Sequence, residues 1–207
     1  LFHPIVTLEG GRRLSTIQIH LPLLAETESD ALAEGARATL ADVAVAVADF
    51  QAMRTAMSDE IQRLAGETHL DTERRQDALD FLEWLENDHF VFLGKRTYTF
   101  LRGDDGTVLP EEPEMVEGSN LGLLRNEDLN VLHRSSEPAM LTPEIGAFLQ
   151  RPDPLIIAKS TMVSRVHRRV NADYVGIKHY DGEGRVCGET RFLGLFTADA
   201  YDETARS

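Results

Sequence analysis

Three segments in the last quarter of the chain predict β-strands and most constrain the fold: residues 155–160, 173–181 and 185–197. The Gly-rich stretch Asp181–Gly184 joins the last two in a tight hairpin. The strand pattern starts earlier, at His89, where the apolar spacing changes from 3.6 residues to 2. Residues 90–101 then predict a strong strand, which turns back into a short one around Val108. The chain is therefore expected to build an antiparallel sheet of about five strands.

The part of the chain before this sheet has the apolar spacing of helices. One stripe recurs every three or four residues and comprises Leu32, Ala36, Leu40, Val43, Val47, Phe50, Met53, Met57, Ile61 and Leu64. A single helix of this length would measure about 50 Å, so a break is expected near Asp49, which can cap a second helix. A further helix is expected over residues 72–86, capped by Asp71. Residues 3–8 and 14–21 predict two strands that turn at Gly10 and Gly11.

These elements predict an α+β fold with antiparallel sheets and packed helices. The polar linker Thr68–Asp71 is the expected boundary between a ββα unit and a second unit of helix plus sheet. Residues 110–154 hold six of the eight prolines and scattered acids, so loops and short helices are expected there. One such helix is expected over Glu144–Leu149, with Pro143 at its first position.

The composition excludes several classes of protein. The formal net charge of -14 disfavours non-specific nucleic-acid binding, which needs a basic face. No apolar run approaches the roughly 18–20 residues of a membrane helix, and no secretory signal is visible. The single cysteine, Cys187, can form no intramolecular disulfide and is expected to be a packing residue in a strand. A cytoplasmic protein without a membrane partner is therefore expected.

The sequence contains none of the common catalytic motifs. No Gly-x-Gly-x-x-Gly follows a strand, since Gly182-Glu-Gly184 falls in the expected hairpin turn. A P-loop, a His-Glu-x-x-His zinc motif and a Gly-x-Ser-x-Gly elbow are all missing. No catalytic or metal-binding residue is therefore assigned, and the chain by itself is not expected to be an enzyme.

One basic cluster stands out in this acidic chain: Lys159, Arg165, His167, Arg168 and Arg169. The residues from Lys159 to Arg169 include no acid. One hypothesis is an anion site for an amino-acid carboxylate, a phosphate or a nucleotide, because Arg makes bidentate planar contacts. The alternative is a set of salt bridges to the acidic stretch 104–117, or to another domain of a longer protein.

Two further features have a structural interpretation. Asp88-His89 lies at a helix-to-strand junction, where capping and packing are expected rather than metal or acid–base chemistry. The aromatic residues of the strand that follows could line a ligand cavity, but they are more often core. They are Phe90, Phe92, Tyr98 and Phe100.

Several stretches resemble the large bacterial NAD-specific glutamate dehydrogenases. They are Ala78-Leu-Asp-Phe-Leu-Glu-Trp-Leu85, Asp88-His-Phe-Val-Phe-Leu-Gly94, Gly118-Ser-Asn-Leu-Gly-Leu-Leu-Arg125 and the segment 155–197. The run Arg191-Phe-Leu-Gly-Leu-Phe-Thr197 is the most specific. The chain departs from the family pattern at Val166-His-Arg-Arg-Val-Asn171, where relatives tend to have Pro in place of Arg169.

The resemblance implies a regulatory N-terminal region. Residues 1–68 would be part of an ACT-like, ferredoxin-like domain, and residues 69–207 a PAS-like domain. The family's catalytic domain, which binds glutamate and NAD, lies far downstream, so no cofactor is expected in this chain. The expected partners are the other domains of the same polypeptide, further copies in a homo-oligomer, and an amino-acid effector. The alternatives are a purely structural oligomerisation module without a ligand, and an unrelated stand-alone sensor domain.

Overall fold

The computed structural model describes residues 5–7, 10–11, 13–103, 108–129, 151–198 and 200. The chain divides into two compact units, residues 1–38 and 39–207, which are treated separately. The helix expected over residues 144–149 lies outside the described residues. No described helix combines the length and the apolar character needed to cross a bilayer.

The first unit contains a small hairpin and the start of a long helix. Strands β1 (Ile5–Thr7) and β2 (Arg13–Ser15) pair antiparallel. Gly10 and Gly11 both have positive φ angles, as expected for the turn between them. The second strand is shorter than the expected residues 14–21. Helix α1 spans Glu26–Ala48 and runs from this unit into the next.

The helical stripe breaks at Asp49, as the sequence predicts. Helix α1 ends at Ala48 and α2 spans Phe50–Ala65. The expected reason for the break is wrong, however, because the Asp49 side chain caps no helix N–H. Its carboxylate instead accepts the backbone N–H of Gly122 at 2.7 Å, 73 residues further along the chain. A tertiary contact therefore stabilises the break.

The next helix begins as expected. Helix α3 spans Thr72–Trp84, and the Asp71 carboxylate accepts the N–H groups of Glu73 and Arg74. A wide π-type turn, η1 (Leu85–His89), ends it. In this turn Asp88 has a φ of 65°, which reverses the chain into the sheet.

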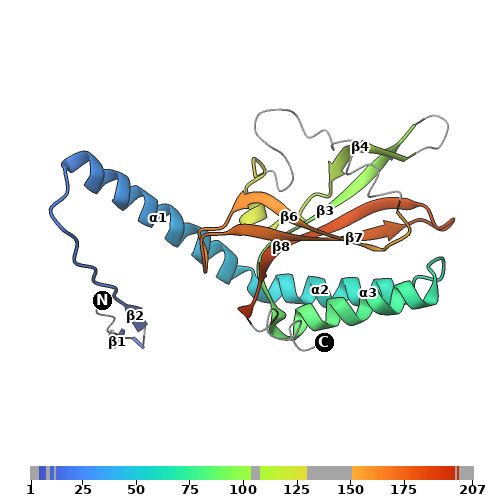
Figure 1. Ribbon diagram of the computed structural model, residues 1–207, viewed down its shortest axis with the longest axis horizontal. Coiled ribbons are helices and arrows are strands. Elements are labelled where there is room, and N and C mark those ends of the chain that lie inside the picture. Colours follow the sequence, from blue (N-terminus) through green and yellow to red (C-terminus); the bar gives the residue numbers. More distant parts are fainter. Residues whose placement is uncertain are drawn as a thin grey trace. The chain divides into compact units, whose positions relative to one another are not determined.

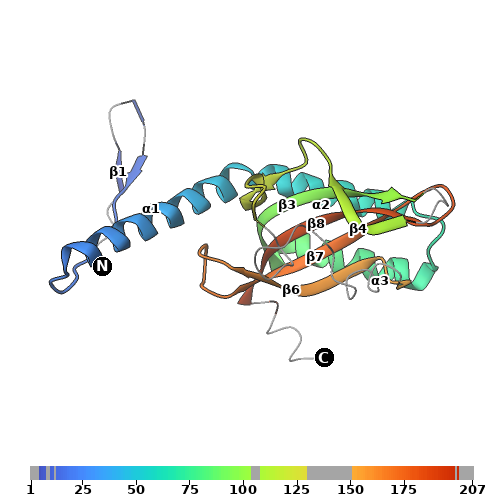
Figure 2. The same cartoon turned by 90° about the horizontal axis from the view of Figure 1, so that it is seen from above.

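All pairs in the main sheet are antiparallel, which confirms the α+β class (Figures 1 and 2). Its strands are β3 (Phe90–Arg102), β4 (Val108–Met115), β5 (Leu121–Gly122), β6 (Leu155–Val163), β7 (Asn171–Tyr180) and β8 (Val186–Phe196). The order is β4-β3-β8-β7-β6, and β5 pairs with β3. Strand β4 continues through Pro113 to Met115, where only loops and short helices were expected; it tolerates the prolines because it is an edge strand.

Helices α2 and α3 lie side by side on one face of the sheet (Figure 1). One core forms between these helices and strands β3, β7 and β8, and its largest fully buried members are Met53, Met57, Leu64, Leu82, Leu85, Ile177 and Phe192. Phe90 and Phe92 belong to it and Phe100 belongs to the core on the opposite face, which confirms the core interpretation for these three aromatic residues; Tyr98 is half-buried and belongs to neither core. The α2 part of the apolar stripe is thus buried. The α1 part differs, because Leu40 and Val47 are 65% and 69% exposed.

The opposite face of the sheet carries a second core. Its buried members are Leu93, Phe100, Leu123, Leu124, Ile156, Ala172, Tyr174, Leu193 and Leu195. Leu123, Leu124 and Leu129 pack on this face, and the first two belong to the short 3-10 helix η2 (Leu123–Arg125). Gly122 permits the sharp entry into η2, because its φ is 59° and a Cβ would collide with the carbonyl of Leu93.

The packing joins elements on both sides of the expected linker. Helix α2 precedes residues 68–71 and α3 follows them, yet both helices share one core. The compact unit that holds the sheet begins at Thr39. The assignment of residues 1–68 and 69–207 to ACT-like and PAS-like domains stays a prediction.

Candidate functional site

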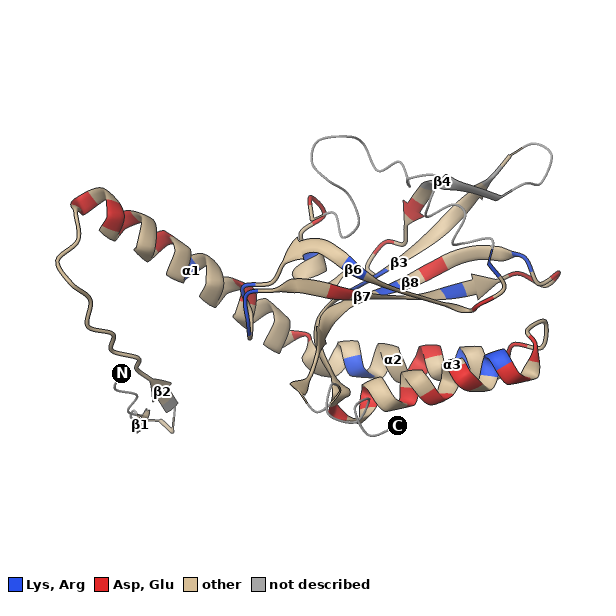
Figure 3. Ribbon diagram, in the orientation of Figure 1, with Lys and Arg blue, Asp and Glu red and all other residues tan. Residues whose placement is uncertain are grey.

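In the basic cluster, Arg165, His167, Arg168 and Arg169 lie in the turn that joins β6 to β7, where part of the ribbon in Figure 3 has the colour of Lys and Arg, and Lys159 lies within β6. The members of the cluster point to different partners. Lys159 forms an ion pair with Asp173 on β7, and Arg165 pairs with Asp42 on α1. Arg168 donates to the carbonyl of Phe196 at 2.7 Å. A single anion site formed by all five residues therefore stays a prediction, and the partners found for these three lie outside the acidic stretch 104–117.

The other two members of the basic cluster, His167 and Arg169, lie in the same turn. His167 has a φ of 69°, a conformation that few non-glycine residues adopt. Both His167 and Arg169 are exposed. Arg165 lines a cavity.

That cavity has a volume of about 350 Å³. Its lining residues are Ala41, Asp42, Val45, Gly122, Leu123, Arg125, Asn126, Leu129, Met162, Val163 and Arg165. They come from the last turns of α1, from the segment 122–129 and from the end of β6. The volume is at the lower end of the range for small-molecule sites, roughly 300–1,000 Å³. The site is therefore the right size for a small organic molecule.

An ion pair fixes one wall of the cavity. Arg125 donates through Nε and Nη2 to the two carboxylate oxygens of Asp49. The hydrogen bond from Arg125 lowers the pKa of Asp49 against the opposing effect of burial. Since Asp49 also holds the N–H of Gly122, one carboxylate ties the α1–α2 junction to the segment that forms the wall.

A second ion pair lies at the rim. Nε and Nη2 of Arg165 both approach the same oxygen of Asp42, at 2.9 and 2.8 Å. The two side chains are 52% and 25% exposed. Among the described residues, neither Oδ1 of Asp42 nor Nη1 of Arg165 has a protein partner. The rim thus offers one hydrogen-bond acceptor and one donor of opposite charge.

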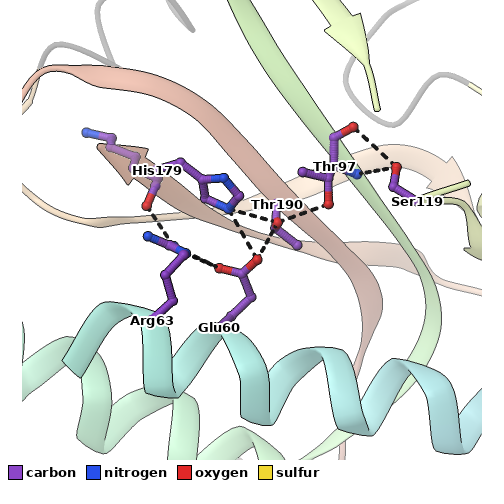
Figure 4. A network of polar contacts seen from close by, with 7 residues as sticks. Glu60, Arg63, Thr97, Ser119, His179 and Thr190 are labelled. Carbon is purple, nitrogen blue, oxygen red and sulfur yellow. Dashed lines mark hydrogen bonds and ion pairs between the residues drawn. The ribbon is translucent and has the colours of Figure 1, made fainter. Parts of the chain in front are cut away.

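A separate polar network joins α2 to the sheet (Figure 4). Oε1 of Glu60 accepts from Thr190 at 2.6 Å and lies 3.2 Å from Nε2 of His179. Oε2 of Glu60 accepts from Nε of Arg63 at 2.8 Å. Arg63 also donates to the carbonyl of Lys178 on β7, and the Thr190 hydroxyl contacts that of Thr97 on β3.

The network contains a hydroxyl, an imidazole and a carboxylate, but its geometry is not that of a nucleophilic triad. In a triad the base contacts the nucleophile with one ring nitrogen and the carboxylate with the other. Here Nε2 of His179 lies near both Thr190 and Glu60, at 3.0 and 3.2 Å. The arrangement instead satisfies a nearly buried carboxylate and attaches α2 to the sheet.

The environment stabilises the charged form of Glu60. Burial would raise its pKa, but the hydrogen bond and charge of His179, the charge of Arg63 and the Thr190 hydroxyl outweigh burial and lower it to about 2. Lys95 also faces this carboxylate, whose charge partly offsets the lowering of the Lys95 pKa by burial. A carboxyl with a lowered folded-state pKa stabilises the fold above its usual pKa of 4.5, and this contribution is lost as the pH falls toward 2.

Replacing Glu60 by glutamine should therefore cost about 2–3 kcal/mol at pH 7. The difference between wild type and variant should shrink as the pH falls from 4.5 to 2, because the wild-type carboxyl becomes neutral too. Urea unfolding at a series of pH values measures this. Glu183→Gln, at a side chain that is 69% exposed, is the control and should change little. A difference that is constant with pH would contradict the assignment.

The opposite face of the sheet holds a buried charged pair. Glu189 on β8 is fully buried; one oxygen accepts from the Tyr174 hydroxyl and the other from Nε of Arg191 at 3.0 Å. The Arg191 guanidinium lies 4.1 Å from the centre of the Tyr98 ring. Burial would lower the pKa of Arg191, but Glu189 and the two tyrosines raise it. Nη2 of Arg191 is buried without a hydrogen-bond partner in the described part of the chain.

His89 packs at the helix-to-strand junction, as expected. Nδ1 of His89 lies 2.8 Å from the carbonyl oxygen of Trp84, and the two rings stack at 4.5 Å. Phe81 and Phe196 extend this aromatic cluster. Across the described ranges, no three His, Cys, Asp or Glu side chains gather in a way that could hold a metal ion.

Asp42, Arg125 and the Glu60 network are parts of these sites that the sequence did not predict. A usable signal existed for Asp42, because it is the one acid in the otherwise apolar run from Leu40 to Ala48. An acid in such a run often pairs with a cation. No local signal marked Glu60 and Thr190, which are 130 residues apart in the chain.

Known relatives match most of the chain. It is 35% identical over 170 residues to an NAD-specific glutamate dehydrogenase of Halomonas elongata, covering 81% of this chain and 10% of the relative. It is 36% identical over 179 residues to the protein of that name from Pseudomonas aeruginosa, covering 86% of this chain and 11% of the relative. The chain matches no protein-family model. The resemblance inferred from the sequence is therefore confirmed, and the chain is a homologue of one segment, about a tenth of the length, of the large NAD-specific glutamate dehydrogenases.

Proposed function

We propose that this chain is a non-catalytic regulatory segment of an NAD-dependent glutamate dehydrogenase. The whole enzyme would convert L-glutamate to 2-oxoglutarate and ammonia with NAD in the cytoplasm, and a separate catalytic domain would bind the NAD. This segment, the N-terminal region, would sense a small effector and contribute to subunit contacts. The observation that carries the proposal is the homology to a tenth of such enzymes in a sequence without a dinucleotide-binding fingerprint.

The structure supports the sensing role through the cavity at Arg165. It is small, largely apolar, and has charged groups at its rim, which is the usual composition of a small-molecule site. An antiparallel sheet with helices on one face also supports the PAS-like assignment of the second part of the chain. The ACT-like assignment of residues 1–68 depends on the sequence resemblance alone.

The purified chain is expected to form no NADH from glutamate and NAD, because it lacks the nucleotide-binding motif that the reaction needs. Absorbance at 340 nm measures this directly. In a thermal-shift screen against amino acids and nucleotides, at least one compound should raise the melting temperature, since a ligand of the native state stabilises it. NADH formation by the chain would overturn the non-catalytic role, and a screen without any shift would overturn the sensing role.

A structural oligomerisation module is the second candidate function, and one observation favours it. Leu32, Leu40 and Val47 follow one another along α1 at spacings of eight and seven residues, and each is at least half exposed. Exposed apolar stripes often mark contacts with other chains. If assembly is the only role, Leu40→Lys should dissociate an oligomer of the chain, measured by light scattering, and the ligand screen should be empty.

A further inference from the structure

We propose that the cavity between α1, the segment 122–129 and the end of β6 binds a small zwitterion with an apolar side chain, the chemistry of an aliphatic α-amino acid. Asp42 holds the ammonium group and Arg165 the carboxylate. The inference rests on the proposed sensing function and names the ligand class of its site. It is narrower than the site for an amino-acid carboxylate, a phosphate or a nucleotide that the basic cluster suggests, which stays a prediction.

The interior of the cavity selects an apolar body. Ala41, Val45, Leu123, Leu129, Met162 and Val163 supply most of its lining. Arg125 also lines it, but Asp49 already binds two of its guanidinium nitrogens. A ligand with a charged side chain inside the cavity would therefore lose the hydration of that charge without gaining an equivalent partner.

The rim selects a ligand with both charges. A carboxylate alone would approach Arg165 but would also lie close to the negative charge of Asp42, 2.8 Å from that guanidinium. An amine alone would approach Asp42 but would also lie close to the positive charge of Arg165. A zwitterion pairs with both rim charges, because Oδ1 of Asp42 can accept a hydrogen bond from the ammonium group while Nη1 of Arg165 donates one to a carboxylate oxygen.

The two rim residues also belong to parts of the fold that are held in place. Asp42 lies on α1, two turns before the Asp49 carboxylate that holds Gly122. Arg165 follows Ser164, which is fully buried and whose hydroxyl donates to the carbonyl of Val166. A ligand would therefore bind to groups that are already positioned, which lowers the entropic cost of binding.

Three compounds with the same apolar body test the proposal on the full chain: L-leucine, 4-methylpentanoate and isopentylamine. An NMR titration measures each dissociation constant and locates the amides that shift. L-leucine should bind at least about tenfold more tightly than either singly charged analogue. The amides of residues 122–129 and 162–165 should shift.

Variants of the rim provide the second arm. Arg165→Gln and Asp42→Asn should each weaken L-leucine binding about tenfold. Asp42→Asn should also narrow the gap between L-leucine and 4-methylpentanoate, because the repulsion of the carboxylate is removed. Arg185→Gln is the matched control, since its side chain is also 52% exposed and ion-paired, in the β7–β8 turn; it should leave binding unchanged.

The outcomes separate the two proposals. Equal binding of L-leucine and 4-methylpentanoate, or L-leucine binding unchanged by both rim variants, overturns the zwitterion site and leaves the sensing role intact. The absence of binding by all three probes also overturns it. The sensing role fails as well only if the wider screen of amino acids and nucleotides gives no stabilising compound.

Discussion

Replacing Arg191 by methionine is expected to lower the free energy of unfolding by about 3–5 kcal/mol. Glu189 is fully buried, and its partners among the described side chains are Arg191 and Tyr174. Without the guanidinium, the carboxylate must stay charged without compensation or take up a proton, and both cost free energy. Urea unfolding at pH 7 measures the loss.

The double variant Arg191→Met with Glu189→Leu is the informative comparison. It removes both charges, so no unpaired ion is left behind, and most of the stability should return. The Tyr174 hydroxyl loses a partner in this variant, so recovery should be incomplete. A single variant that costs less than about 1 kcal/mol, or a double variant no more stable than the single one, would show that the pair is not a buried ion pair of this kind.

Arg96→Met is expected to cost about 3–4 kcal/mol and to loosen the segment 120–129. The Arg96 side chain donates to the carbonyls of Leu124 and Asn126 at 2.6 and 2.9 Å, and to Oδ1 of Asn120 at 3.0 Å. It also contacts the Tyr98 hydroxyl and the carbonyl of Leu129. One nearly buried guanidinium therefore holds the residues that follow the two-residue strand β5, which is the part of this segment that pairs with β3.

Hydrogen exchange distinguishes this role from a general loss of stability. The amides of residues 121–129 should exchange faster in Arg96→Met at a denaturant concentration where the sheet remains protected. Binding at the cavity should weaken as well, because this segment forms one of its walls. Arg74→Met is the control, since the Arg74–Asp153 pair is exposed and should contribute less than about 1 kcal/mol. Exchange that rises equally in all elements would contradict a local role.

These two expectations and the Glu60 network share a physical basis. Arg96 and the Glu60 network each connect β-strands to a segment distant in the chain through a nearly buried charge, and the buried Glu189 carboxylate connects Arg191 on β8 to Tyr174 on β7. Apolar packing supplies the cores on the two faces of the sheet. The polar contacts require particular directions between donor and acceptor, and so they fix the position of each segment against the sheet. The cavity depends on them, because the Asp49–Arg125 pair and Arg96 hold the segment that forms its wall.

The sequence by itself determined the local elements and the family. The two-residue period located β3, β7 and β8, the glycine-rich run located the last hairpin, and Asp71 located the start of α3. These signals are local, because side-chain alternation, turn geometry and helix capping depend on residues a few positions apart. The runs shared with glutamate dehydrogenases are likewise properties of the sequence, and the relatives confirm them.

The tertiary structure alone decided which charges meet. Asp49 was expected to cap α2 and instead holds Gly122 and Arg125. Arg165 was grouped with its basic neighbours, yet it pairs with Asp42, 123 residues earlier in the chain. Leu40 and Val47 continue the spacing of the α2 core residues and remain exposed. Amphipathic spacing tells which residues share a face but not what covers that face, and the partner of a charge depends on how the chain folds back on itself.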